Sequence, residues 1–157
     1  EMWRVISSNP DTTFLLLTKR IDRFYINLPD DWRCGYPNVI IGVTVENQYQ
    51  ADIRLPLLLD APAKGKFISC SPLLENIDIE RYLKGIGYVS VAGEVAKSGR
   101  VLDFDWVVSL KNQCEKFGTE MFFKDTGSLV KVNGVVEKVP RLFQRRKAKE
   151  LLKVNKT

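Results

Sequence analysis

Five short apolar runs alternate with polar or charged clusters along the first four fifths of this chain. The runs are Phe14 to Leu17, Val39 to Val45, Phe67-Ile68, Tyr88 to Ala92 and Met121 to Phe123. Continuous apolar runs of this length are typical of parallel strands, which are buried on both faces. In parallel α/β proteins ligands bind at the loops after the carboxyl ends of the strands. The pattern therefore predicts five parallel strands and places any binding site in the polar clusters that follow them.

Segments whose apolar residues recur with helical periodicity lie between the predicted strands. Five helical segments are expected: Met2 to Ser8, Ile21 to about Asn27, Gln48 to Asp60, Ile77 to Leu83, and a helix that Asp103 caps and Gly118 ends. Within the third segment we expect Pro56 to begin a second stretch, because proline lacks the N–H that a helix interior needs. Past residue 127, Asn133-Gly134 lies between Leu129 to Val132 and Val135 to Lys138, which is the strongest short hairpin signal. A basic helix from about Arg141 to Val154 follows.

The order of elements predicts the fold class α/β, as a partial (β/α) barrel of about five parallel strands with a C-terminal β-hairpin and basic helix. Five units are too few to close an eight-stranded barrel, so the barrel is open or belongs to a larger chain. The first helix has no N-cap, which favours the larger chain. We expect residues 1–127 to form the barrel domain, and residues 128–157 to pack on it or trail from it.

The net charge of +5 is concentrated at the C-terminus. Seven basic residues against Glu150 give residues 141–157 a charge of +6, which leaves −1 for residues 1–140. A basic segment can bind nucleic acid or an acidic protein, and the candidate residues are Arg145, Arg146, Lys147 and Lys149. The alternative is a solvated helix face or a frayed terminus.

Composition limits the remaining possibilities. No apolar run approaches the roughly 20 residues of a membrane span, and no signal peptide is evident, so we expect a cytoplasmic protein without a membrane partner. The three cysteines, Cys34, Cys70 and Cys114, are far apart, and the chain has no histidine. We therefore expect no disulfide framework and no protein-held metal. Cys70 lies within an apolar strand, which favours an inert buried thiol over a nucleophile.

Polar side chains follow each predicted strand and form the candidate binding site. They are Lys19, Arg20, Glu46, Asn47, Ser69, Ser71, Glu94 and Lys124, together with Asp125. Lysines can bind the anionic groups of an amino acid or nucleotide fragment, while carboxylates bind an amine or ribose hydroxyls. The same charges can instead neutralise one another as ion pairs. Catalytic residues are not assigned, because acid–base chemistry needs a partner and a shifted pKa that a sequence does not show.

Six ordered segments resemble the second half of the phage gene-product thirty-seven/sixty-eight family, which has unknown function and radical S-adenosylmethionine-like features. They are Thr13 to Arg20, Pro37 to Gln48, Arg54 to Leu59, Phe67 to Leu74, Val91 to Glu94 and Met121 to Lys124. The resemblance extends to about Gly127 and implies a partial (β/α) barrel. It also implies that the residues at the strand ends, among them Lys19, Glu46, Ser69 and Glu94, line a pocket.

In that family the first half carries a three-cysteine motif for a [4Fe–4S] cluster that binds S-adenosylmethionine, and this chain has no such motif. The resemblance therefore implies no cofactor held by this chain alone. S-adenosylmethionine is a candidate ligand, and a cluster requires ligands from another segment. Ser71 stands where the family usually has a glutamate, and Ala92 and Lys124-Asp125 replace a glycine and a lysine–glutamine pair.

Three functional hypotheses follow. The first is the substrate-side half of a radical S-adenosylmethionine-like barrel, without catalysis on its own, which an upstream segment or a second subunit completes. The second is a non-enzymatic module whose basic tail binds nucleic acid or an acidic protein. The third is a structural remnant that associates with another subunit through the open edge of the sheet.

Overall fold

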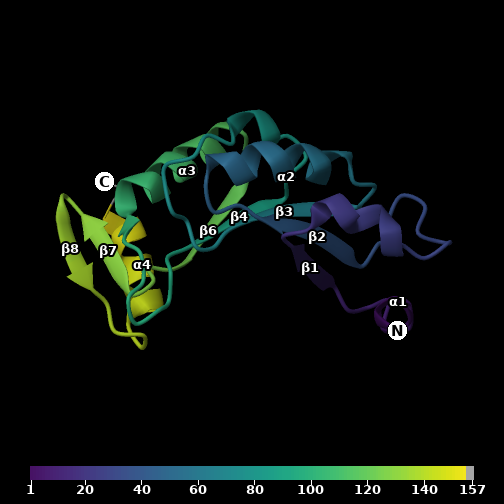
Figure 1. Ribbon diagram of the computed structural model, residues 1–157, viewed down its shortest axis with the longest axis horizontal. Helices are drawn as coiled ribbons and strands as arrows, with labels where there is room; N and C mark the ends of the chain where they lie inside the picture. Colours follow the sequence, from purple (N-terminus) through teal and green to yellow (C-terminus); the bar gives the residue numbers. More distant parts are fainter. Residues whose placement is uncertain (155–157) are drawn as a thin grey trace.

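A five-stranded parallel sheet with helices on one face forms the centre of the computed structural model, which describes residues 1–154 (Figure 1). The strand order is β1-β2-β3-β4-β6. The strands are β1 (Phe14–Thr18), β2 (Val39–Thr44), β3 (Gly65–Cys70), β4 (Tyr88–Ala92) and β6 (Glu120–Asp125). Every neighbouring pair is parallel, as the alternation of strands and helices predicts.

Helices α2 and α3 cover one face of the sheet. The helical segments are α1 (Met2–Ser7), η1 (Ile21–Asn27), α2 (Gln48–Asp60), η2 (Glu80–Tyr82), α3 (Phe104–Lys116) and α4 (Gln144–Val154), where η denotes a 3₁₀ helix. Asn47 caps α2 by accepting from the Gln50 N–H, and Asp103 caps α3 by accepting from the Asp105 N–H. Both helices therefore begin directly after a polar residue that ends an extended segment.

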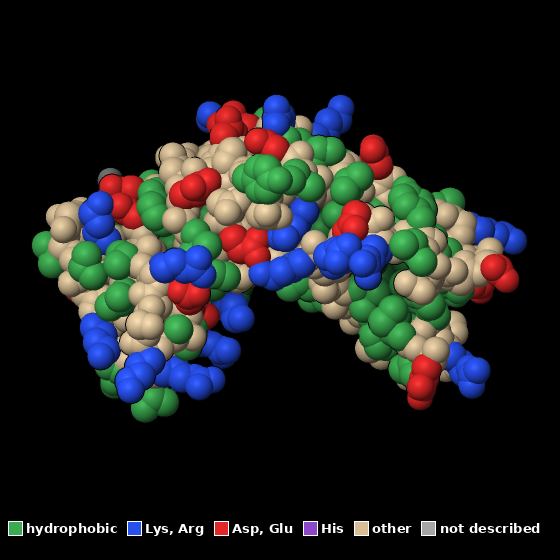
Figure 2. Space-filling model, viewed as in Figure 1, with side chains coloured by type: hydrophobic (Ala, Val, Ile, Leu, Met, Phe, Trp, Pro, Cys, Tyr) green, Lys and Arg blue, Asp and Glu red, His purple; other side chains and the backbone are tan. Residues whose placement is uncertain are grey.

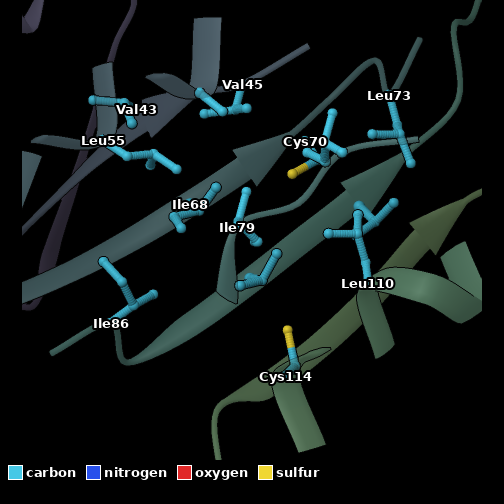
Figure 3. Close-up of a cluster of buried hydrophobic side chains, with 14 of the residues drawn as sticks. Val43, Val45, Leu55, Ile68, Cys70, Leu73, Ile79, Ile86, Leu110 and Cys114 are labelled. Carbon is cyan, nitrogen blue, oxygen red and sulfur yellow. The ribbon is translucent and has the colours of Figure 1, made fainter. Parts of the chain in front are cut away.

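The hydrophobic core lies between the sheet and these helices. Figure 3 shows Val43 and Ile68 from the sheet, Leu55 from α2 and Leu110 from α3 converging in this layer. All four side chains are fully buried. The apolar runs that predicted the strands therefore supply the sheet side of a single core.

The C-terminal part forms a second, smaller sheet. Its strands are β5 (Leu102–Asp103), β7 (Leu129–Val132) and β8 (Val135–Lys138), in the order β5-β7-β8. The hairpin β7–β8 turns at Asn133 and Gly134, both with positive φ, as the Asn-Gly signal predicts. Helix α4 follows the hairpin and packs beside β6.

These elements confirm the mixed α/β class, with the predicted five parallel strands, hairpin and C-terminal helix, and they are consistent with a partial (β/α) barrel. Two predictions are wrong. Helix α2 continues through Pro56 without a break, since loss of one N–H donor at a surface helix is tolerated when the flanking turns pack on the sheet. Residues 77–83 contain only the short 3₁₀ helix η2, because the side chain of Gln113 bonds to the backbone of residues 77 and 79 in place of helical hydrogen bonds.

The expectation that both faces of the sheet are buried is also wrong. The face opposite α2 and α3, called the inner face below, is open, and Figure 2 shows the molecule hollowed on that side. Leu15, Leu17 and Phe122 on this face are each more than half exposed. Near the centre of the face the Phe67 ring stacks on Tyr88 with centroids 4.9 Å apart and covers Gly42, where a Cβ would clash with the ring.

Within residues 1–154 no helix is both long and apolar enough to cross a bilayer.

Candidate functional site

Four of the predicted site residues extend the inner face beyond the carboxyl ends of the strands. Thr44 pairs with Ser69, and Ser69 with Ser90, in one row across the inner face. Side chains two residues apart on a strand point to the same face. Residues that continue this alternation lie at the rim of the inner face, and they are Lys19, Glu46, Ser71 and Glu94. The structure thus brings four separate strand ends to one rim.

Glu46 is the centre of the rim. It is buried, and its carboxylate accepts hydrogen bonds from Lys19 after β1 and from Arg54 of α2, the latter at 2.8 Å. Burial opposes ionisation of Glu46, but the hydrogen bond from Lys19 and the charges of Arg54 and Lys19 hold its pKa below the usual value. Arg54 also donates to the Thr44 carbonyl at 2.6 Å. Glu46 is therefore an ionised, doubly paired carboxylate and not a general base of raised pKa.

Glu94 forms the second charged group of the rim. Both of its carboxylate oxygens accept from the Arg100 guanidinium, at 2.6 and 3.0 Å, and the Arg100 backbone N–H donates at 2.8 Å. These hydrogen bonds lower the pKa of Glu94 to about 2. The charge of Glu46 also contributes to the raised pKa of Arg100, so the two groups interact across the rim.

Backbone contacts between loops fix the position of Glu94. Gly93 N–H donates to the Asp125 carbonyl, and Ser128 N–H donates to the Glu94 carbonyl at 2.9 Å. A Cβ on Gly93 would lie 2.1 Å from the Thr126 carbonyl oxygen, and one on Gly127, whose φ is +68°, would strike the Glu94 backbone. Only two glycines allow the loops after β4 and β6 to pass this closely.

The loop after β3 connects the same strand ends. Leu73 N–H donates to the Ala92 carbonyl and Leu74 N–H donates to the Glu46 carbonyl, each at 2.9 Å. In this loop the Ser71 hydroxyl oxygen is buried and has no hydrogen-bond partner among the described residues.

The structure gives other predicted site residues different surroundings. Arg20 pairs with Asp22 of η1 instead of joining the rim. Asn47 caps helix α2 with its side chain. Ser69 is buried on the inner face, and Lys124 is exposed on β6. Asp125 is buried and accepts from the Gly127 N–H, which makes it part of the loop crossing.

Two charged residues of the rim were not predicted as site residues, namely Arg54 and Arg100. Both approach from outside the strand ends: Arg54 from the second turn of α2, and Arg100 from the loop after β4. A buried carboxylate after a strand needs a cation within reach, and Arg54 is close to Glu46 in the chain. That signal could have found Arg54. Arg100 has no such signal, because only the path of the loop after β4 shows that it pairs with Glu94.

The cysteines do not form a metal site. Cys70 and Cys114 are buried in the core between sheet and helices (Figure 3), whereas Cys34 is exposed. Burial raises the pKa of the Cys70 thiol far above its usual range and that of Cys114 to about 11, so neither is a thiolate near neutral pH. No group of three metal-ligating side chains occurs among residues 1–154. The described residues therefore do not fit an iron–sulfur cluster.

The basic candidates on α4 divide into two groups. Lys147 pairs with Glu137 at 2.6 Å, and Arg146 pairs with Glu150 at 2.8 Å. Arg145 and Lys149 are exposed, lie one turn apart, and form no ion pair within residues 1–154; Lys153 continues their row. Lys156, the last basic residue of the predicted tail, lies outside the described residues.

One family model matches the chain, the family described as Protein of unknown function (DUF5131), and it covers residues 1–154. No curated protein and no solved structure matches. The match supports a family of unknown function, and it does not support the narrower phage gene-product or radical S-adenosylmethionine-like description.

Proposed function

Since the chain belongs to the DUF5131 family, whose function is unknown, we propose that it is the ligand-binding half of a partial (β/α) barrel, of the radical S-adenosylmethionine-like kind. The rim binds a small molecule that carries an amino-acid group. The chain has no catalysis of its own in this proposal. Any cluster chemistry depends on ligands from another segment that completes the barrel.

The convergence of charges from three strand ends is the observation that carries this proposal. Lys19, Glu46 and Glu94 follow β1, β2 and β4, and α2 and the loop after β4 add Arg54 and Arg100. Parallel sheets bind ligands at this end, where the loops can vary without disturbing the core. Charged residues buried at a strand end cost free energy, and a ligand site is a physical reason to keep them there.

The charge pattern favours a zwitterionic ligand. The Lys19 and Arg100 side chains are 57% and 61% exposed, so each can leave its carboxylate and bind the carboxylate of a ligand. Glu46 and Glu94 are then free to accept from an ammonium group. S-adenosylmethionine carries such an amino-acid group and is the probe of choice.

Calorimetric titration of the full chain with S-adenosylmethionine tests the proposal. We expect saturable binding that Glu46→Gln weakens by about tenfold or more, because a neutral amide loses the charge-assisted bond to the ligand ammonium. Since the hydrogen bonds from Arg100 hold the pKa of Glu94 at about 2, and Lys19 and Arg54 hold that of Glu46 below its usual value, both carboxylates are ionised near neutral pH, and the affinity is expected to be nearly constant between about pH 6 and pH 7.

Glu80→Gln is the matched control. Glu80 also pairs with a lysine, but it lies in η2 and its partner Lys116 is the last residue of α3, so neither residue is at a strand end. It should bind the probe with wild-type affinity. Equal affinity of the wild type and Glu46→Gln, or no heat of binding at all, contradicts the proposal.

A second candidate function rests on the row formed by Arg145, Lys149 and Lys153. These side chains share one face of α4 and border a shallow groove of about 420 Å³ with the exposed Leu142. Since they form no ion pair within the described part of the chain, they are available for phosphate groups. This candidate is a binding module that contacts the backbone of single-stranded nucleic acid.

Titration of the full chain with a fluorescent single-stranded oligonucleotide at several salt concentrations tests this second function. Contacts from three cations predict a slope near −2 when the logarithm of the binding constant is plotted against the logarithm of the salt concentration. Neutralising Arg145 and Lys149 to Gln should reduce the slope by more than half. Neutralising Arg146 and Lys147, which already pair with Glu150 and Glu137, should change it little. Equal effects of the two double variants contradict a role for the exposed row.

A further inference from the structure

Three cations without acidic partners line a groove between the loop after β4 and the segment that joins β8 to α4. They are Lys97, Lys138 and Arg141, and the groove, called the basic groove below, has a volume of about 430 Å³. None of the three forms an ion pair within residues 1–154, and none of the described residues that line the groove is Asp or Glu. Figure 2 shows Lys and Arg side chains gathered at the lower end of the lobe that contains β7, β8 and α4. Like charges in so small a space repel one another and oppose folding.

A neighbouring groove, which shares Val139 with the basic groove, is lined by paired charges. There Lys147 pairs with Glu137 at 2.6 Å and Arg146 pairs with Glu150 at 2.8 Å. The excess of positive charge is therefore a property of the basic groove itself and not of the whole C-terminal part.

Hydrogen bonds between the two segments fix the walls of the basic groove. The Ser128 hydroxyl oxygen accepts from the Ala96 N–H at 3.2 Å, and the Ser128 carbonyl accepts from the Val139 N–H at 2.9 Å. The side chain of Gln144, which is buried at the start of α4, donates to the Val139 carbonyl at 3.1 Å. The three cations thus extend from backbone that is held on both sides of the groove.

Two further features of the basic groove favour an anion. The Ser128 hydroxyl lines it and donates no hydrogen bond within the described part of the chain, so its O–H is available to a ligand. The groove also reaches Gln144, the first residue of α4, and this helix has no acidic residue in its first turn. The N-terminal end of a helix carries a partial positive charge. Cations, a hydroxyl donor and the positive end of a helix therefore meet in one place.

We propose that the basic groove binds a phosphate group through Lys97, Lys138 and Arg141. A phosphate monoester carries about two negative charges and three strong acceptor oxygens, which match three cationic donors. A carboxylate carries one charge and would leave the excess positive charge of the groove largely unbalanced. The volume is within the range of small-molecule sites, so the groove has room for the group to which the phosphate is attached.

Two kinds of molecule can supply such a phosphate. A mononucleotide can occupy the basic groove alone. Alternatively, Arg141 lies four residues before Arg145, so a nucleic-acid backbone bound along α4 can continue into the groove. Only this second source rests on the candidate function of the α4 row, and neither source rests on ligand binding at the rim.

An NMR titration of the full chain with inorganic phosphate, at an ionic strength kept constant with chloride, tests the inference. We expect saturable shifts of the backbone amide signals of Ala96, Ser128 and Val139. Neutralising Lys97 and Arg141 to Gln should weaken phosphate binding by about tenfold or more, because two of the three charge-assisted contacts are lost.

Arg4→Gln with Lys84→Gln is the matched control. It also removes one exposed arginine and one exposed lysine without an ion pair in residues 1–154, but Arg4 lies in α1 and Lys84 lies before the amino end of β4. The control should bind phosphate like the wild type. Absence of saturable shifts at the three amides, or equal weakening by the two double variants, overturns the inference.

Two more probes identify the source of the phosphate. If neutralising Lys97 and Arg141 weakens binding of adenosine 5′-monophosphate and leaves binding of a single-stranded oligonucleotide unchanged, the groove binds a free nucleotide. If it also weakens binding of the oligonucleotide, the groove continues the nucleic-acid path of α4. Both results support the phosphate site. Neutralising Arg145 and Lys149 should leave the shifts caused by inorganic phosphate in place, which separates this site from the α4 row.

Discussion

Replacing Gly93 with alanine is expected to lower the free energy of unfolding by more than about 3 kcal/mol. That is the upper end of the usual cost of adding a methylene group to a well-packed core. The new Cβ would lie 2.1 Å from the Thr126 carbonyl oxygen and 2.9 Å from the Gly127 nitrogen. Both contacts are backbone atoms, which cannot rotate away as a side chain can. Urea unfolding followed by circular dichroism measures the loss.

Gly87→Ala is the control for the loss of a glycine as such. Its Cβ would meet only the Lys66 carbonyl oxygen at 3.5 Å, an ordinary contact, and Gly87 has no positive φ. We expect its stability to lie within about 0.5–1 kcal/mol of the wild type. If the two variants are equally stable, the close crossing of the loops after β4 and β6 does not exist in solution.

Replacing Gln113 with leucine is expected to cost about 2–5 kcal/mol, because two buried backbone groups lose their partner. The Gln113 side chain is buried on α3, accepts from the Ile79 N–H and donates to the Ile77 carbonyl, both at 2.8 Å. Leucine has a similar volume, so the effect comes from lost hydrogen bonds and not from a cavity. The midpoint of thermal unfolding should fall by roughly 4–20 °C.

Asn112→Leu provides the comparison. Asn112 precedes Gln113 on α3, but its side chain is exposed. It should change the unfolding free energy by no more than about 0.5 kcal/mol. If Gln113→Leu and Asn112→Leu have equal midpoints of thermal unfolding, the loop at residues 77–79 does not depend on Gln113.

Both variants concern the positions of the loops that form the candidate rim. Gly93 sets the approach of the loops that carry Glu94 and Asp125, while Gln113 holds the segment that follows Leu74. The apolar core beneath them would remain intact in either variant. Measuring ligand binding at temperatures where these variants are still folded would therefore separate rim geometry from global stability.

Local sequence patterns were sufficient for most elements. Strand β4 and both hairpin strands have the predicted bounds, because continuous apolar runs and the Asn-Gly turn are short-range signals. The helix after Asp103 was predicted from its cap and its apolar face, and the structure has it at Phe104–Lys116. Strand β5, only two residues long, was not predicted, since its pairing with β7 comes from residues distant in the chain.

The candidate rim was predicted in part. Strand-end position identified Lys19, Glu46 and Glu94, because parallel strands bring their carboxyl ends together whatever the details of packing. Arg20 and Asn47 are also at strand ends, but they bond to Asp22 and Gln50 nearby in the chain. Position at a strand end alone does not show whether a side chain bonds to a group from another strand end or to a residue nearby in its own loop.

By itself the sequence determined the alternation of strands and helices, the burial of Cys70, the basic C-terminal helix and the end of the sheet at which charges gather, since all of these follow from short-range periodicity and polarity. Only the tertiary structure decided that Arg100 completes the rim, that the Ser71 hydroxyl has no hydrogen-bond partner within residues 1–154, and that the inner face and the edge of β1 are open among those residues. These features depend on which distant segments meet and which surfaces they leave uncovered, and a local pattern does not encode either.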